Sequence, residues 1–419
     1  MRLHIRNARV VDPASGREGS GELFVVDGRI SGEGGKPDRV IDATNLVVAP
    51  GFIDLSARLR EPGYEYKATL ESEMQAALAG GVTSLACPPD TDPPLDEPGL
   101  VDMLRRRAKA LSCARVYPIG ALTMKLEGQA LTEMGQLTDA GCVAFSQANA
   151  PLADTQVLWR ALQYAATFGY PVWLRAEDAW LARGGVAHDG EVATRLGLAG
   201  IPPFAETIAL ATLLELVRAT RARLHVCRLS TAGAVELMRR AKQEGLAVSC
   251  DVGVHHVHLC DMDLGYFDSQ CRLEPPLRAG RDRDALARAL AEGVIDCLCS
   301  DHTPVDDDGK HLPFAQAEPG ATGLELLLPL ALKWGEAQGL GLAATLARIT
   351  SEPARILGVP SGRLTPGAPA DLAIFDPAAR LRIAPETLKS QGKNTPFLGC
   401  ELAGRVRYTI VAGQVVYES

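Results

Sequence analysis

The sequence lacks a long apolar run, an excess of basic residues and an apolar segment near its start. Its longest apolar stretch, Leu324 to Leu332, is far too short to cross a bilayer and contains Pro329. There are 43 Lys and Arg residues against 51 Asp and Glu residues, a formal net charge of −8, which argues against a nucleic-acid partner. No secretory signal is visible. We therefore expect a cytoplasmic protein that binds neither membranes nor nucleic acids.

Cysteine spacing of the zinc-finger kind is also missing. The ten cysteines are scattered and none belongs to a Cys-x-x-Cys pair. Cys297 and Cys299 are the only close pair, and residues two apart on a strand share one face. The pattern is typical of reduced, buried thiols in a cytoplasmic protein.

What the sequence does contain is an alternation of strand and helix patterns. Eight β-rich runs are recognisable: Phe52–Arg58, Val82–Pro88, Val116–Leu122, Cys142–Ser146, Pro171–Arg175, Leu224–Arg228, Ala247–Val252 and Ile295–Asp301. One helical stripe comprises Leu70, Met74, Ala77 and Leu78. Ser230 is the expected N-cap of a later helix. Eight such units predict an α/β protein whose residues 51–363 form a (β/α)8 barrel, with a doubly wound open sheet as the alternative.

The two ends of the chain share a different pattern of short strands joined by tight turns. The expected strands are Leu3–Val11, Leu23–Val26, Leu46–Val48, Ala370–Phe375, Val406–Val411 and Val415–Tyr417. Asp27-Gly28 and Ala412-Gly413 are turn signals. We expect residues 1–50 and 364–419 to form one composite β-sandwich domain.

Active sites of (β/α)8 barrels lie at the C-terminal ends of the strands. The predicted strands end in or near Arg58, Arg175 and Arg228, and also in or near Asp301 and Glu177. The mouth of the barrel should therefore collect several arginines and a few acids.

Motifs along almost the whole chain resemble those of dihydroorotases. In chain order they are Pro50-Gly51-Phe52-Ile53-Asp54-Leu55, Leu59-Arg60-Glu61-Pro62-Gly63, Asp92-Pro93-Pro94-Leu95-Asp96, Ala176-Glu177-Asp178, Ser230-Thr231, Pro275-Pro276-Leu277-Arg278, Ser300-Asp301-His302-Thr303-Pro304, Gly323-Leu324-Glu325, Gly367-Ala368-Pro369-Ala370-Asp371-Leu372 and Lys393-Asn394-Thr395-Pro396-Phe397. The resemblance implies the barrel of the amidohydrolases and a metal-assisted opening or closure of a cyclic amide.

The resemblance breaks at the residues that would hold the metal. Active relatives carry a His-x-His pair on the first strand, an acid on the fourth, histidines on the fifth and sixth, and an aspartate on the eighth. The corresponding residues here are Ser56, Arg58, Gln147, Arg175, Arg228 and Asp301. An arginine is always protonated and has no lone pair to donate. We therefore expect no tightly bound zinc, no other cofactor and no dihydroorotase reaction, with Asp301 left as a catalytic relic.

The substrate positions implied by the resemblance are altered as well. Arg60 is kept and would pair with a substrate carboxylate, but Asp90 and Glu274 stand where asparagines are expected. Two added negative charges should oppose an anionic ligand. We expect Asp301 to be neutralised by Arg58, Arg175 or Arg228 rather than to act in catalysis.

Other candidates for chemistry favour structural roles. These are the cluster His255, His256 and His258, then His302 as an orienting residue, His225 as a packing residue, Lys125, and the loop Asp306-Asp307-Asp308-Gly309, which lacks the spacing of a calcium loop. Gly184–Gly190 and the Gly309 region are expected to be mobile loops over the mouth.

The resemblance narrows the function to a few hypotheses. The first is a noncatalytic dihydroorotase homologue that supports the assembly and activity of aspartate carbamoyltransferase, as some bacterial chains of this family do. A second is an enzyme with changed chemistry, although no nucleophile–base pair is evident. A third is an atypical but active dihydroorotase that converts N-carbamoyl-aspartate to dihydroorotate. A homodimer of the chain is compatible with each of them.

Overall fold

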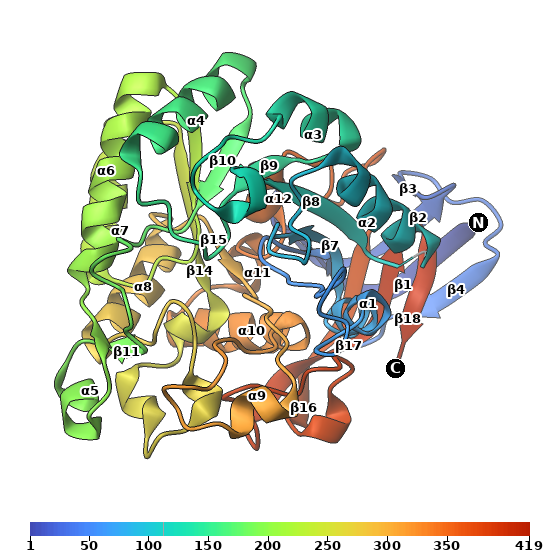
Figure 1. The fold of residues 1–419 in the computed structure, drawn as a ribbon. Helices are drawn as coiled ribbons and strands as arrows, with labels where there is room; N and C mark the ends of the chain where they lie inside the picture. The colour runs from blue at the N-terminus through green and yellow to red at the C-terminus, as the bar shows by residue number, and fades with distance from the viewer. Residues whose placement is uncertain (112) are drawn as a thin grey trace.

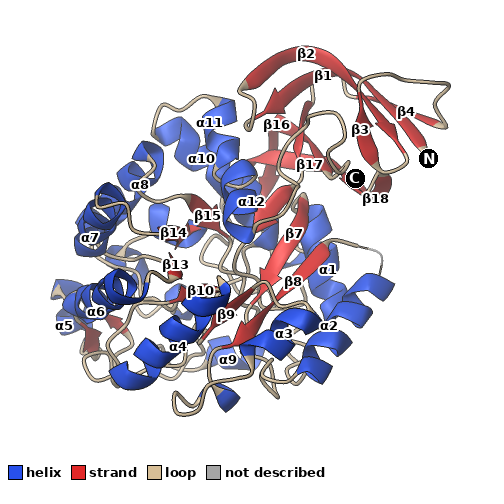
Figure 2. Cartoon of the chain, turned by 90° about the horizontal axis from the view of Figure 1, so that it is seen from above, coloured by secondary structure: helices blue, strands red, loops and turns tan. Residues whose placement is uncertain are grey.

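The computed structural model describes residues 1–111 and 113–419, which form a barrel ringed by helices and a second sheet beside it (Figures 1 and 2). The barrel strands are β6 (Phe52–Asp54), β7 (Val82–Cys87), β8 (Arg115–Ala121), β9 (Ala144–Ser146), β10 (Pro171–Leu174), β13 (Arg223–Val226), β14 (Val248–Gly253) and β15 (Cys297–Cys299). They lie in the order β15-β14-β13-β10-β9-β8-β7-β6 and are parallel throughout. Each of the eight runs predicted from the sequence overlaps one of these strands.

The first and last strands meet and nearly close the sheet into a barrel. Ala57 and His302 form a parallel bridge just beyond β6 and β15. The backbone N–H of Arg58 donates to the carbonyl oxygen of His302 at 2.9 Å, and the N–H of His302 donates to that of Ser56 at 3.0 Å. The predicted (β/α)8 barrel is therefore confirmed, and the doubly wound open sheet was the wrong alternative.

Helices surround the barrel strands, as Figure 2 shows from above. They are α1 (Leu70–Ala79), α2 (Pro98–Ala110), α3 (Met134–Ala140), α4 (Thr155–Phe168), α5 (Glu191–Leu196), α6 (Phe204–Thr220), α7 (Ala232–Gln243), α8 (Gly280–Glu292), α9 (Asp307–His311), α10 (Leu327–Ala337), α11 (Leu342–Ala347) and α12 (Ser351–Leu357). Short 3₁₀ turns are η1 (Met124–Leu126), η2 (Val254–Val257), η3 (Asp261–Leu264), η4 (Ser269–Cys271), η5 (Leu324–Leu326) and η6 (Pro385–Thr387). In the described part of the chain, no helix has both the length and the apolar character needed to span a membrane.

The N-cap of α7 is Thr231, so the expectation of Ser230 was wrong by one residue. The Thr231 side chain accepts a hydrogen bond from the backbone N–H of Ala234, and its backbone is extended. Ser230 instead donates its N–H to Glu206 and accepts from Arg278 through its hydroxyl. Adjacent Ser and Thr have the same capping chemistry, and tertiary partners decide between them.

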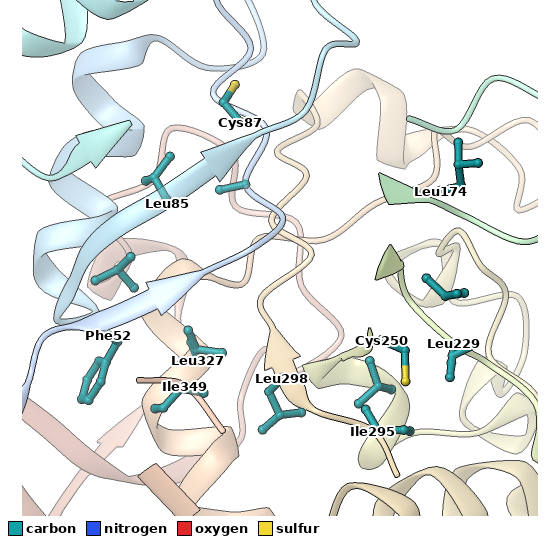
Figure 3. Close-up of a cluster of buried hydrophobic side chains, with 14 of the residues drawn as sticks. Phe52, Leu85, Cys87, Leu174, Leu229, Cys250, Ile295, Leu298, Leu327 and Ile349 are labelled. Carbon is teal, nitrogen blue, oxygen red and sulfur yellow. The ribbon is translucent and has the colours of Figure 1, made fainter. Parts of the chain in front are cut away.

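Two apolar layers hold the barrel together. A large cluster fills the space between the strands and the helices, with Phe52, Leu298 and Leu327 among its members (Figure 3). A second cluster contains Ile53, Trp173 and other strand side chains together with Ile356 and Leu357 from the α12 end. Cys297 and Cys299 both belong to this second cluster, which confirms that they share a face.

Both ends of the chain contribute to one connected sheet of eight strands, seen beside the barrel in Figure 1. Its members are β1 (Arg2–Asp12), β2 (Arg17–Val26), β3 (Arg29–Ser31), β4 (Arg39–Asp42), β5 (Val47–Pro50), β16 (Leu372–Arg382), β17 (Glu401–Val411) and β18 (Gln414–Glu418). A separate pair, β11 (Ala187–His188) and β12 (Gly200–Ile201), lies in the loop after β10. The expected domain bounds, 1–50 with 364–419 and 51–363, stay a prediction.

The chain ends join because β5 pairs with both β1 and β16. Both predicted turns are present: Asp27 and Gly28 have φ of 48° and 78°, and Ala412 and Gly413 have φ of 48° and 76°. Positive φ at both central residues is what a tight type I′ hairpin needs.

Candidate functional site

The mouth of the barrel is built from residues that follow the barrel strands. Arg228 and Asp301 lie two residues past the ends of β13 and β15, with φ of 55° and 47°. Arg60, past β6, has φ of 61°. The left-handed region costs a residue with a side chain roughly 1–2 kcal/mol. The fold holds these three backbones in strained conformations at the place where barrels carry their active sites.

Asp301 is the centre of the mouth and is almost fully buried. Its Oδ1 accepts hydrogen bonds from Ser56 Oγ at 3.3 Å and from Arg228 Nη1 at 3.2 Å. The Nη1 of Arg58 lies 3.5 Å from the same oxygen. The expectation that arginines neutralise Asp301 is confirmed for Arg58 and Arg228. Arg175, the remaining alternative, is bound to other carboxylates.

Arg58 is shared between Asp301 and Asp90. Its Nε donates to Asp90 Oδ2 at 2.7 Å, and its Nη1 also donates to Thr303 Oγ1 at 3.1 Å. Burial opposes the charged form of Asp90, but the positive charges of Arg58 and Arg60 outweigh it and hold the pKa of Asp90 below its ordinary value. Asp90 is therefore a counter-ion of Arg58.

Arg175 binds two glutamates. Its guanidinium donates to both carboxylate oxygens of Glu177, at 2.9 and 2.7 Å, and to Glu274 Oε1 at 2.7 Å. Asp90 and Glu274, the two added negative charges, each form an ion pair with an arginine at one of the six positions. That they oppose an anionic ligand stays a prediction.

Arg228 is fixed by several acceptors in addition to Asp301. Its Nη1 lies 3.3 Å from the carbonyl oxygen of Glu274, and its Nη2 donates to Asn149 Oδ1. Burial lowers the pKa of this guanidinium, but Asp301 together with Cys227, Cys299 and Asp251 more than offsets it, and the pKa lies above the ordinary value. Arg228 therefore stays charged.

The charges of the mouth nearly cancel. Four arginines, at positions 58, 60, 175 and 228, face four carboxylates, at positions 90, 177, 274 and 301. Arg60 donates its Nε to the Pro304 carbonyl oxygen at 2.9 Å and makes no ion pair within the part of the chain that is described. Burial and the nearby Arg58 lower the pKa of Arg60.

This donor set does not fit a divalent cation. Three of the six positions present guanidiniums, which donate hydrogen bonds and have no lone pair for a metal. Gln147 hydrogen bonds with Thr123 through both its amide nitrogen and oxygen, at 2.8 and 3.1 Å. Asp301 is the one carboxylate among the six, and its Oδ1 already receives three donors.

The three neighbouring histidines have structural contacts, as expected. Burial lowers the pKa of His255 to about 3 and that of His258 to about 4. Nε2 of His258 is 2.9 Å from the carbonyl oxygen of Leu330, and Nε2 of His256 is 3.0 Å from that of Pro275. The Nε2–H of each of these two rings therefore donates a hydrogen bond to a backbone carbonyl oxygen.

His302 orients its strand end, as the sequence analysis expected. Its Nδ1 accepts the backbone N–H of Gly323 at 3.1 Å, so its Nε2 carries the proton that is donated to Glu73. Glu73 also accepts from Ser390 Oγ and from the N–H of Gln391. Burial alone would raise the pKa of Glu73, but His302 and the other donors bring it below the ordinary value. These hydrogen bonds link the end of β15 to α1 and to the segment that contains Ser390 and Gln391.

Two other candidates from the sequence, Lys125 and the acidic segment after β15, can be located in the structure. Lys125 is exposed, in a turn after β8, which does not suit a buried metal-bridging lysine. In the acidic segment after β15, Asp307 and Asp308 are exposed and begin the short helix α9, in which Gly309 and Lys310 are buried.

One cluster of chemically active side chains was missed by the sequence analysis. His225 packs against Trp173 as expected, with ring centroids 4.9 Å apart, but it also binds Asp251 and Ser249. Within the described residues, His225, Cys227 and Asp251 are the one group of three or more potential metal ligands. The available signal was the spacing of two between His225, on β13, and Cys227, which directly follows it.

Family comparisons agree with the motifs found in the sequence. The family described as dihydro-orotase-like matches residues 45–234, and the amidohydrolase family matches residues 205–417. A dihydroorotase-like protein of Pseudomonas aeruginosa is 46% identical over all of both chains. One of Pseudomonas putida is 44% identical over 100% of this chain and 99% of the relative. A dihydroorotase of Anaeromyxobacter dehalogenans is 41% identical over 99% of this chain and 98% of the relative.

Solved structures share the architecture. The L-hydantoinase (dihydropyrimidinase) from Arthrobacter aurescens is 25% identical and superposes with a TM-score of 0.88 over 99% of this chain and 96% of its own. The dihydropyrimidinase from Brevibacillus agri is 22% identical, with a TM-score of 0.86 over 100% of this chain and 95% of its own, and supports the fold alone.

Proposed function

Because this chain belongs to the dihydroorotase-like family of amidohydrolases, we propose that it is a noncatalytic member. Its role would be that of a structural subunit in pyrimidine biosynthesis, which supports the assembly and activity of aspartate carbamoyltransferase. The protein would act in the cytoplasm and would need no metal at the mouth. The proposal has one part about chemistry and one about the partner.

The contacts of Asp301 support the first part of the proposal, that the chain is noncatalytic. The family's reaction needs a metal to lower the pKa of water from about 15.7 to near neutrality. Here Arg58 and Arg228 supply positive charge to Asp301 instead, and neither can bind or activate a water as a metal does. Asp90 and Glu274 pair with the new arginines, so these arginines have carboxylate partners without a ligand.

The intact scaffold supports the partner part. Barrel closure, the two-ended sheet and the His302–Glu73 hydrogen bond are all present, while the replaced residues Arg58, Arg175 and Arg228 follow the ends of barrel strands. A chain whose fold is consistent at every level but whose catalytic positions are replaced is expected when the fold itself is used. The partner is inferred by analogy with noncatalytic chains of the same family.

Light scattering tests the partner directly. The masses of this chain, of aspartate carbamoyltransferase from the same cell, and of their mixture would be measured. We expect one larger species on mixing, together with a gain of carbamoyltransferase activity. Unshifted masses and unchanged activity would reject the partner, and the mass of the chain alone would show whether it forms a homodimer.

A metal-dependent dihydroorotase with an atypical site is the second candidate. The observation that favours it is the 41% identity to a relative that is called a dihydroorotase. Ring opening of dihydroorotate and its reverse would be assayed with added zinc. Turnover at ordinary enzyme rates that Asp301→Asn abolishes would replace the noncatalytic proposal, whereas background rates in both proteins would support it.

A further inference from the structure

Four side chains with metal-binding chemistry lie in the barrel strands just before the mouth. His225 and Cys227 belong to or follow β13, Asp251 lies on β14, and Cys299 ends β15. His225 is three residues before Arg228, and Cys299 is two residues before Asp301. The four residues therefore form a layer beneath the arginine-lined mouth.

Three of the potential ligand atoms of this layer converge, and the fourth side chain, Cys299, contacts one of the three. One atom from each of His225, Cys227 and Asp251 lies within 4.8 Å of the other two. The Sγ of Cys299 is 3.6 Å from Asp251 Oδ1. Residues at alternate positions of a strand share one face, which explains how His225 and Cys227 reach the same carboxylate from one strand.

The donor types suit a thiophilic divalent cation. Zinc in proteins takes Cys sulfur, His nitrogen and Asp oxygen in a four-coordinate arrangement. Nδ1 of His225 is 2.9 Å from Ser249 Oγ, while Nε2 is turned to Asp251 Oδ2 at 2.9 Å. A metal-binding histidine commonly gives its other ring N–H to such a second partner, which fixes the ring orientation. Here Ser249 would fill that role.

The environment of the layer is buried and carries negative charge. Burial, followed by the charge of Asp251, raises the pKa of both the Cys227 and the Cys299 thiol well above the ordinary value. A bound cation would replace the thiol protons, as metal binding to such ligands releases protons. Cys227 is partly exposed, which gives one of the four ligands contact with solvent.

We propose that His225, Cys227, Asp251 and Cys299 form a binding site for a thiophilic divalent cation such as Zn²⁺, inside the barrel and beneath the mouth. The site shares no residue with the six positions that resemble the family's metal ligands. It does not depend on the proposed partner function. The ion would stabilise the barrel by linking β13, β14 and β15.

Cobalt titration of the full chain tests the site. Co²⁺ bound by thiolates gives charge-transfer absorption, and a four-coordinate ion gives intense visible bands. We expect both signals to saturate near one equivalent, to be lost in Cys227→Ser and in His225→Gln, and to persist in Cys142→Ser, a buried cysteine outside the layer. Absent bands, or bands that are the same in all four proteins, would overturn the proposal.

X-ray absorption at the zinc edge is a second test, and it needs no variant. Its result therefore does not depend on whether the variants fold. On the unaltered chain loaded with one equivalent of Zn²⁺, we expect sulfur ligands at about 2.3 Å besides nitrogen or oxygen ligands. A shell of nitrogen and oxygen alone would overturn the site. Neither result changes the expected mass shift with aspartate carbamoyltransferase, so the two proposals fail separately.

Discussion

At the scale of single residues, Asp301 is where the stability of the mouth should be most sensitive. Asp301→Ala would leave Arg58 and Arg228 buried without the carboxylate that both contact. Removing one partner of a buried ion pair costs roughly 3–5 kcal/mol, because the remaining charge stays desolvated. We expect a loss of that size in the free energy of unfolding, measured by urea denaturation.

Two control variants allow the loss of stability in Asp301→Ala to be interpreted. Ser56→Ala removes one hydrogen bond, donated by a hydroxyl to the same carboxylate oxygen, and should cost about 1.5 kcal/mol. Glu236→Ala removes an exposed partner of Arg240 and should cost less than about 1 kcal/mol. If Asp301→Ala were no more costly than these two, the idea that the ion pairs replace the metal's charge would be wrong.

Sequence patterns predicted which residues reach the mouth but not how they pair. The positions of Arg58, Arg228 and Asp301 follow from where the strands end. The pairing of Arg175 with Glu274 does not, because it depends on a loop that returns from β14 about a hundred residues later. The contact between Asp251 and His225 could not be predicted either, because it depends on the pairing of β14 with β13.

At the scale of elements, the 3₁₀ turn η2 and the residue after it should make the fold sensitive to acid. His258 has a pKa of about 4 in the folded chain, and an unfolded histidine has one near 6.5. At pH values between these two pKa values, the unfolded chain binds more protons at this histidine than the folded chain does. The stabilising contribution is therefore complete above about pH 6.5 and is lost as the pH falls toward 4.

The variant His258→Gln tests this contribution while keeping a donor for the Leu330 carbonyl. Urea unfolding between pH 4.5 and 6.5 would be compared with that of the unaltered chain. One proton less in the unfolded state reduces the slope of stability against pH by up to about 1.4 kcal/mol per unit. His311→Gln, which removes an exposed histidine, is the control variant. An equal slope in all three proteins would contradict the assignment.

Elements themselves were largely predictable, because their signals are local. The stripe that includes Leu70 and Met74 is α1, and the eight β-rich runs are the barrel strands. What the sequence left undecided was the choice between neighbouring caps, such as Thr231 over Ser230, since both residues have the required chemistry. Contacts with Glu206 and Arg278 made that choice.

At the scale of the whole molecule, the sheet of chain ends is joined to the barrel by contacts that run through β17. Val406 and Val411 pack in the large barrel cluster, while Ile410 packs in the core of the sheet. The hydroxyl of Thr409 donates to the carbonyl oxygen of Leu78 in α1 at 2.6 Å. The strand therefore contributes to both cores, which a list of strand signals could not reveal.

Removing residues 401–419 should consequently unfold more than the sheet. The deletion opens both clusters and exposes the edge of β16, a surface that favours aggregation. We expect an insoluble product, or one without a cooperative unfolding transition in near-ultraviolet circular dichroism. Deleting only residues 414–419 removes the outer strand β18, whose side chains are partly or fully exposed, and should leave a cooperative fold of lower stability. A cooperative transition in the larger deletion would mean that the barrel, predicted as residues 51–363, folds without the sheet, and that β17 stabilises only the unit to which it was assigned.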